Sequence, residues 1–106
     1  TERLADRILA RAGRGGRVLD IGCGDGKLLL ALARRGFEGV GTDLNPRLRE
    51  TVSPESGEVY VGEFEEAHFP SASFRVVVVR HVLEHLRDPP AALREIRRVL
   101  ADDGIL

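Results

Sequence analysis

The chain has 106 residues, with 16 basic and 17 acidic side chains mixed along its length and a net charge of −1. This size predicts one domain over residues 1–106, and the balanced charge argues against a nucleic-acid or membrane-surface partner. The sequence has no signal peptide and no apolar run near the ~20 residues of a membrane span. A single cysteine excludes an internal disulfide framework and a cysteine-based zinc site. We therefore expect a cytoplasmic protein.

The first part of the chain predicts helix, strand, glycine turn and helix. Leu4, Ile8 and Leu9 recur at helical spacing within residues 1–12. A glycine-rich loop ends this helix, and residues 17–21 form the first strand. A second helix follows the turn, with Asp25 as its cap, Leu28, Leu29 and Leu32 buried, and Gly36 at its end.

The second part continues the alternation of strands and helices. Val76 to Val79 are four β-branched residues in a row, which indicates a strand buried on both faces in the middle of a parallel sheet. The other expected elements are strands over 37–42 and 58–61, a short helix opened by Asn45-Pro46, a helix opened by Asp88-Pro89 with Leu93, Ile96, Val99 and Leu100 on one face, and a fifth strand from Gly104. This order predicts an α/β fold, a doubly wound, mostly parallel sheet with helices on both faces.

Both ends of the chain suggest that it is part of a longer protein. It contains no methionine, which removal of an initiator before Thr1 would explain, and it stops two or three residues into the expected fifth strand. We therefore expect a sheet truncated after the start of that strand.

The glycine turn after the first strand predicts a nucleotide-type cofactor. Strand, glycine turn and helix place a ligand at the carboxyl end of a parallel sheet, against bare backbone. A dinucleotide site usually keeps G-x-G-x-x-G, but here the third glycine, Gly26, comes one residue early. Asp20 and Asp25 flank the turn and would repel a pyrophosphate. The turn therefore favours a cofactor that has positive charge and no phosphate.

The D-x-G-x-G sequence after a strand resembles the first motif of the class I S-adenosylmethionine-dependent methyltransferases. The resemblance implies that the backbone of Gly22, Cys23 and Gly24 contacts the methionine end of S-adenosylmethionine, and that Asp20 helps to hold its amino group. The alternative for Asp20 is a structural carboxylate that holds the turn. Acidic neighbours oppose the lowering of a thiol pKa at a helix N-terminus, so we expect Cys23 to be inert.

Residues after the next two strands fit the same cofactor. Asp43 lies at the end of the second strand, where a carboxylate can accept hydrogen bonds from both ribose hydroxyls, and Leu44 would lie against the adenine. In the family, an acid after the third strand accepts from the adenine amino group and the next backbone amide meets a ring nitrogen. The resemblance gives these roles to Glu63 and Phe64. The alternatives are a helix cap at Asp43 and a solvated acidic loop at Glu63.

Residues 74–86 resemble the F-D-V-V…H-V-L-E-H-L motif of one large subgroup of small-molecule-type class I enzymes, with Arg75 in place of the aspartate. The resemblance implies that Arg80 and His81 border the methyl end of the cofactor, where the acceptor docks. His81 is the candidate catalytic residue if the acceptor must lose a proton. Packing at a helix terminus is the alternative for His81 and His85.

Two other motifs overlap this region. The H-x-x-E-H pattern of residues 81–85 matches a zinc protease motif with Glu84 as general base, but a third ligand and a peptide cleft are missing. We therefore expect no metal site. Asp88-Pro89-Pro90-Ala91 partly matches the D-P-P-Y motif of nucleic-acid amino methyltransferases. It lies too far from its strand, and Ala91 offers no aromatic face to stack a flipped base.

The sequence therefore predicts a methyltransferase core that binds S-adenosylmethionine, releases S-adenosylhomocysteine and methylates a small-molecule acceptor. Two alternatives stay open. The first is a cofactor-binding module without turnover, which Arg75 and the missing later strands favour. The second is a nicotinamide-dependent oxidoreductase, which the early third glycine and the acids oppose.

Overall fold

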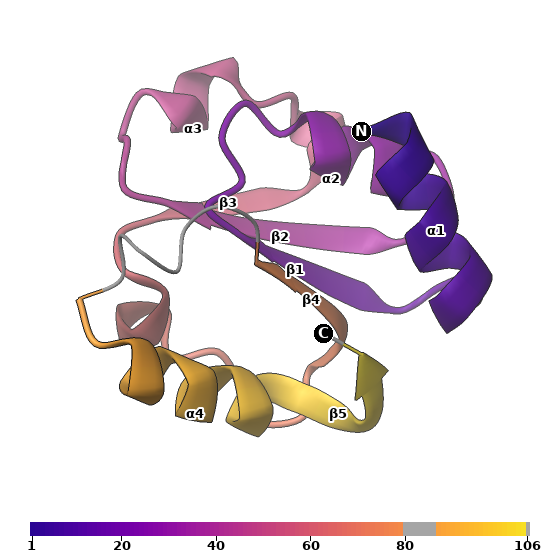
Figure 1. Ribbon diagram of the computed structural model, residues 1–106. Helices are drawn as coiled ribbons and strands as arrows, with labels where there is room; N and C mark the ends of the chain where they lie inside the picture. Colours follow the sequence, from indigo (N-terminus) through magenta and orange to yellow (C-terminus); the bar gives the residue numbers. More distant parts are fainter. Residues whose placement is uncertain (80–86, 106) are drawn as a thin grey trace.

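The computed structural model describes residues 1–79 and 87–105, and its five strands form one parallel sheet in the order β3-β2-β1-β4-β5 (Figure 1). The elements in chain order are α1 (Glu2–Ala12), β1 (Arg17–Ile21), α2 (Lys27–Ala33), β2 (Glu38–Asp43), α3 (Leu48–Thr51), the 3-10 helix η1 (Pro54–Ser56), β3 (Glu58–Val61), the 3-10 helix η2 (Phe64–Ala67), β4 (Phe74–Val79), α4 (Pro89–Val99) and β5 (Leu100–Ile105). The predicted α/β fold class is confirmed. Among the described helices, none is long and apolar enough to cross a membrane.

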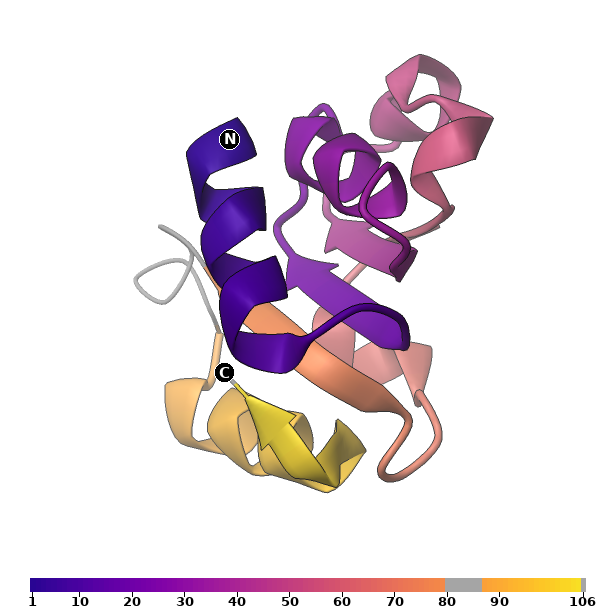
Figure 2. The same ribbon diagram turned by 90° about the vertical axis from the view of Figure 1, so that its right-hand side faces the viewer.

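The sheet separates two hydrophobic cores. Figures 1 and 2 show α1, α2 and α3 on one face and α4 on the other. Side chains alternate along a strand, so Val18 of β1 packs with α1 and α2, whereas Leu19 and Ile21 pack with α4 and η2. Val76 and Val77 of β4 divide in the same way and are 2% and 0% exposed. β4 is therefore buried on both faces, as its run of valines predicted.

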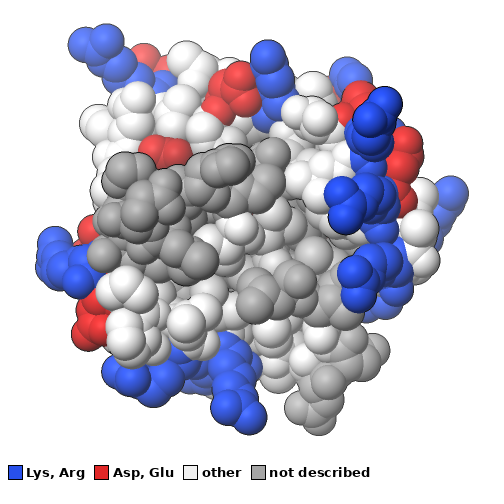
Figure 3. Space-filling model, in the orientation of Figure 1, with Lys and Arg blue, Asp and Glu red and all other residues white. Residues whose placement is uncertain are grey.

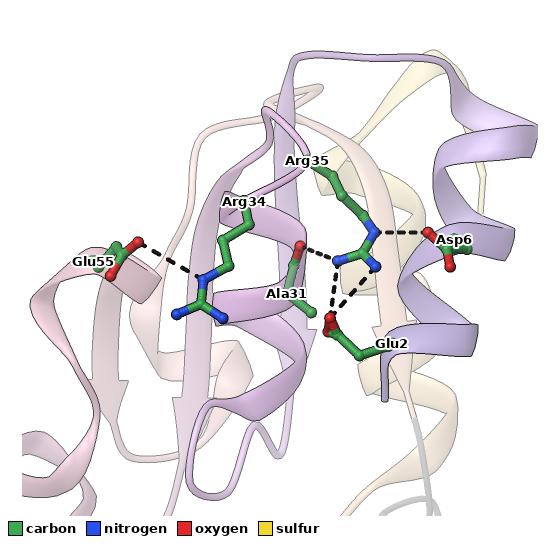
Figure 4. A network of polar contacts seen from close by, with 6 residues as sticks. All are labelled: Glu2, Asp6, Ala31, Arg34, Arg35 and Glu55. Atoms are coloured by element: carbon green, nitrogen blue, oxygen red, sulfur yellow. Dashed lines mark hydrogen bonds and ion pairs between the residues drawn. The ribbon is translucent and has the colours of Figure 1, made fainter.

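Arg35 joins α1 and α2, two of the helices on the same face of the sheet (Figure 4). Its guanidinium donates to Asp6 Oδ1 at 2.8 Å and to Ala31 O at 2.8 Å, and it lies 3.4 Å from Glu2 Oε1. The carboxylates belong to α1, and Ala31 belongs to α2. Because one cation collects three acceptors from two helices, it fixes the angle at which α1 lies against α2.

Arg75 has a structural role at the amino end of β4. One guanidinium nitrogen donates to Gly15 O at 2.8 Å, and the other donates to Ala12 O at the end of α1. These carbonyls lie in the last turn of α1 and in the loop after it, where a helix leaves acceptors unpaired. The arginine that stands in place of the family's aspartate therefore ties α1 and its loop to the sheet. Arg75 therefore lies at the opposite end of β4 from the carboxyl edge of the sheet.

Replacing Arg75 with alanine is expected to lower the free energy of unfolding by about 1–3 kcal/mol, because two backbone carbonyls lose a charged donor. Urea unfolding followed by circular dichroism measures the change. Arg11→Ala is the matched control, since Arg11 is exposed on α1 and makes no ion pair with any described residue. An equal loss in both variants would contradict this role for Arg75.

Two predictions about the last helix and strand were wrong. Leu93 is 48% exposed, and the buried face of α4 is formed by Ala92, Ile96 and Val99. Both Leu93 and Ala92 have helical spacing to Ile96, but the helix ends at Val99, so Leu100 leaves it to pair with Phe74. β5 therefore begins at Leu100 rather than at Gly104. The β4–β5 pairing has a register shift between Phe74 and Val76.

The cap predicted for the second helix also needs correction. Gly26, in the left-handed conformation, is the N-cap of α2. Asp25 precedes it, and its Oδ1 accepts from Lys27 N at 3.1 Å. Asp25 therefore satisfies the first free amide of the helix from one position further out, because the glycine turn ends one residue later than the pattern suggested.

Candidate cofactor site

Three predicted segments meet at the carboxyl edge of the sheet. The glycine turn follows β1, Asp43 ends β2, and Glu63 comes two residues after β3. The parallel register pairs Ile21 with Thr42 and Asp43 with Val61. Gly62 N also donates to Asp43 O at 2.8 Å, which holds the start of the Glu63 segment beside the end of β2. The fold thus brings together residues that lie far apart in the sequence.

The backbone amides of the glycine turn are bonded within the protein. Gly22 N and Cys23 N both donate to Thr42 O, at 2.8 and 2.9 Å, and Gly24 N donates to Asp43 Oδ2 at 3.0 Å. Gly24 has φ +57°, and a Cβ built on it would meet none of the described atoms within 4 Å. The turn therefore offers open space at Gly24, but its three successive N–H groups already have acceptors.

Asp43 connects the turn to the loop after β2. Its Oδ2 accepts from Gly24 N and its Oδ1 accepts from Asn45 N at 3.1 Å. It is not the N-cap of α3, which is Arg47, and Asn45 Oδ1 accepts from Arg47 N instead. An ionised carboxylate has about four acceptor positions, so two remain for hydroxyl groups. The ribose role predicted for Asp43 and its structural role can therefore coexist.

The other predicted residues differ in exposure. Asp20 is 1% exposed near the end of β1, and Leu44 is 60% exposed next to Asp43. Glu63 is half-buried and immediately precedes η2. Phe64 is 2% exposed, and its ring stacks on Phe69 with the centroids 6.3 Å apart. Phe64 can therefore face a ligand only with its backbone. Arg80 and His81, like the whole H-V-L-E-H-L motif, lie outside the described residues.

Cys23 is the buried residue of the glycine turn, and it is 5% exposed. Burial first, and then the negative charges of Asp20, Asp43 and Asp25, together raise the pKa of its thiol from the ordinary 9.0 to about 12. The thiol is therefore neutral at pH 7, which agrees with the prediction that Cys23 is inert. The same three carboxylates place negative charge around Cys23 in the glycine turn.

The raised pKa of Cys23 predicts a stability difference in alkali. In the unfolded chain the thiol ionises near pH 9.0, but in the folded protein it keeps its proton until about pH 12. Between these values the folded state binds more protons, so the free energy of unfolding should fall as the pH rises. Urea unfolding on both sides of pH 9.0 should show a steeper fall for the wild type than for Cys23→Ala, which lacks the thiol. Parallel curves would contradict the prediction.

Two contributors to the site were missed by the sequence reasoning. Thr42 acts through its carbonyl, which every residue has, so no side-chain pattern could reveal it. Gly41 lies on β2 opposite Asp20 and beneath Cys23. The alternation of glycines at 39 and 41 within a strand was a usable signal, because glycine in a strand often marks a close backbone approach.

No group of three or more His, Cys, Asp or Glu side chains in the described part of the chain is arranged to hold a metal ion. The residues of the H-x-x-E-H pattern are not in that part.

The comparisons with known proteins identify the family of this chain. The family described as "Methyltransferase domain" matches residues 1–106. The uncharacterized methyltransferase YcgJ of Bacillus subtilis is 36% identical over 95 residues, which cover 83% of this chain and 38% of YcgJ. The crystal structure of YcgJ has a TM-score of 0.83 at 30% identity and matches 98% of this chain and 48% of that chain.

Two further proteins extend the comparison. The ubiquinone biosynthesis O-methyltransferase of Neisseria meningitidis serogroup C is 34% identical over 102 residues, which cover 88% of this chain and 43% of that protein. A TehB-like SAM-dependent methyltransferase from Corynebacterium glutamicum has a TM-score of 0.81 at 31% identity, covering 95% and 59% of the two chains. The chain spans about two fifths of the length of these curated relatives, 38% and 43%. It belongs to the methyltransferase-domain family and has the fold of the class I S-adenosylmethionine-dependent enzymes.

Proposed function

We propose that this chain is the cofactor-binding core of an S-adenosylmethionine-dependent methyltransferase. The cofactor would lie across the carboxyl ends of β1, β2 and β3, and S-adenosylhomocysteine would be the product. When bound, S-adenosylmethionine supplies an electrophilic methyl group on a sulfonium, and the protein's main task is to place that methyl in line with the acceptor atom.

The observation that carries this proposal is the state of the glycine turn. A pyrophosphate needs free N–H donors and a positive field, but the amides of Gly22, Cys23 and Gly24 already donate to Thr42 O and Asp43 Oδ2. Three carboxylates act on the thiol of Cys23 and make the local field negative. This arrangement favours a cationic ligand without phosphate, such as an amino acid with a sulfonium, over a nicotinamide dinucleotide.

Each predicted contact has a chemical reason. The remaining acceptor positions of Asp43 suit the two ribose hydroxyls, and the exposed Leu44 offers an apolar surface to the adenine. Asp20 adds negative charge near the amino group. Glu63 would accept from the adenine amino group, with the backbone amide of Phe64 toward a ring nitrogen. Arg80 would border the methyl end of the cofactor, and His81 would take a proton from the acceptor.

The acceptor that we propose is a small molecule. The net charge is −1, and on the face shown in Figure 3 the Lys and Arg side chains of the described residues lie at the margins rather than in a central positive patch. The relative from Neisseria meningitidis is named as an O-methyltransferase of ubiquinone biosynthesis. A cytoplasmic location and a single domain over residues 1–106 remain predictions from the sequence.

Isothermal titration calorimetry with S-adenosylmethionine, S-adenosylhomocysteine and NAD tests the cofactor. We expect both sulfur ligands to bind and NAD not to bind, and the reverse result would overturn the proposal. A methyl-transfer assay over a panel of small acceptors then separates an active enzyme from a module that holds the cofactor without turnover.

A further inference from the structure

We propose that Gly41 is a positioning residue for the cofactor, because Cys23 of the glycine turn packs directly against the Cα of Gly41, in the volume that a side chain would need. This inference builds on the proposed function, since it concerns the turn that would contact S-adenosylmethionine. Gly41 itself lies inside β2 and pairs with Asp20 and Val59. It is buried, so its part in binding is indirect.

The contacts at Gly41 are made by the turn. A Cβ built on Gly41 would lie 2.6 Å from Cys23 Sγ, 2.8 Å from Cys23 Cβ and 2.8 Å from Leu29 Cδ1. Real Cβ atoms are not found at such distances, so Cys23 occupies the volume that any other residue at 41 would need. The backbone of Gly41 does not have a positive φ. Its lack of a side chain is therefore required by packing and not by conformation.

The position of Cys23 affects the hydrogen bonds of the neighbouring amides in the turn. Its N donates to Thr42 O beside the bond from Gly22, and its O accepts from Gly26 N at 3.1 Å. Gly24, the next residue, donates to Asp43 Oδ2. A methyl group at position 41 would push Cys23 away from β2, and the bonds of Gly22 and Gly24 to β2 would lengthen with it. The result would be a displaced turn and a disturbed Asp43 in an otherwise folded sheet.

Gly39 provides a matched control on the same strand and the same face. The three atoms nearest to a Cβ there would be Ser56 O at 2.8 Å, Leu29 Cδ2 at 3.0 Å and Leu29 Cβ at 3.8 Å, and none of them belongs to the glycine turn. Gly39→Ala therefore has a comparable cost in packing, but it strains η1 and α2 at a distance from the site. A purely structural role for Gly41 would make the two variants behave alike.

The test compares Gly41→Ala with Gly39→Ala by calorimetry with S-adenosylmethionine, at a temperature where both are folded. We expect Gly41→Ala to bind at least about tenfold more weakly than Gly39→Ala, a difference of about 1.4 kcal/mol. Hydrogen exchange in the ligand-free protein is the second readout. The amide of Gly24 should exchange faster in Gly41→Ala and at the wild-type rate in Gly39→Ala.

The double variant Gly41→Ala/Cys23→Gly completes the test. It removes two of the three atoms nearest to the new methyl and leaves the end of the flexible Leu29 side chain, so slow exchange at Gly24 should return relative to Gly41→Ala. If Gly41→Ala does not fold, a folded double variant with slow exchange at Gly24 still supports the positioning role of Gly41. Equal affinities and equal exchange in the two single variants would overturn it. If the wild type does not bind S-adenosylmethionine, the proposed function fails, and hydrogen exchange alone decides the role of Gly41.

Discussion

Replacing Asp43 with alanine is expected to weaken the binding of S-adenosylmethionine by at least about 30-fold, which corresponds to about 2 kcal/mol. The carboxylate would lose charged hydrogen bonds to two ribose hydroxyls, and such bonds contribute roughly 1.5–3 kcal/mol each. It would also release Gly24 N and Asn45 N, which it now fixes at 3.0 and 3.1 Å. The ligand would therefore lose both a direct contact and the ordered turn beside it.

Asp43→Asn separates these two effects. The amide keeps one carbonyl oxygen, which can hold Gly24 N, but it has no charge and fewer acceptor positions for the ribose. We expect an affinity between those of the wild type and the alanine variant.

Asp25→Asn is the matched control for charge. Asp25 lies on the same turn and its side chain is 60% exposed, so screening by solvent should keep the change within about threefold. Calorimetry on the three variants, with circular dichroism to confirm the fold, measures these effects. Wild-type affinity in a folded Asp43→Ala protein would remove Asp43 from the site.

The order of the elements could be predicted from the sequence because strong local signals separate them. The bounds of β1 and β3 were predicted as they are observed, since glycines precede β1 and follow both strands. The run of valines identified β4 as an interior strand of the sheet, where it lies between β1 and β5. The buried face of α4 could not be read in the same way, because Leu93 and Ala92 both have helical spacing to Ile96. Only the point at which the helix ends decides between them.

The chemistry of the candidate site was partly visible in the sequence. Acids at the ends of successive strands, Asp43 and Glu63 among them, mark one edge of a parallel sheet, so their proximity followed from topology. The pairing of the turn amides with Thr42 O and Asp43 Oδ2 could not be predicted, because it depends on the angle at which the turn meets β2. The role of Arg75 was hidden for a similar reason. Its acceptors are carbonyls 60 and 63 residues away in the chain.

The largest loss of stability is expected from Phe74→Ala. Phe74 is 0% exposed at the start of β4, where its ring meets Phe69 edge to face at 5.3 Å and lies 4.9 Å from the guanidinium carbon of Arg17. Truncation of a buried phenylalanine costs about 3–5 kcal/mol, out of a total of about 5–15 kcal/mol for a typical domain. The variant should therefore unfold at a much lower urea concentration than the wild type.

Phe74 belongs to the lower core, the hydrophobic core between the sheet and α4. That core also contains residues of β1, η2 and α4, and the ring of Phe74 meets Phe69 and Arg17, so a cavity at its position weakens the packing of several elements. Phe74→Leu keeps most of the volume and should cost less than about 1.5 kcal/mol. Leu93→Ala, on the exposed side of α4, should change stability by less than about 0.5 kcal/mol. Urea unfolding that ranked Leu93→Ala with Phe74→Ala would mean that α4 packs on the sheet through the other face, and the placement of the lower core would then be wrong.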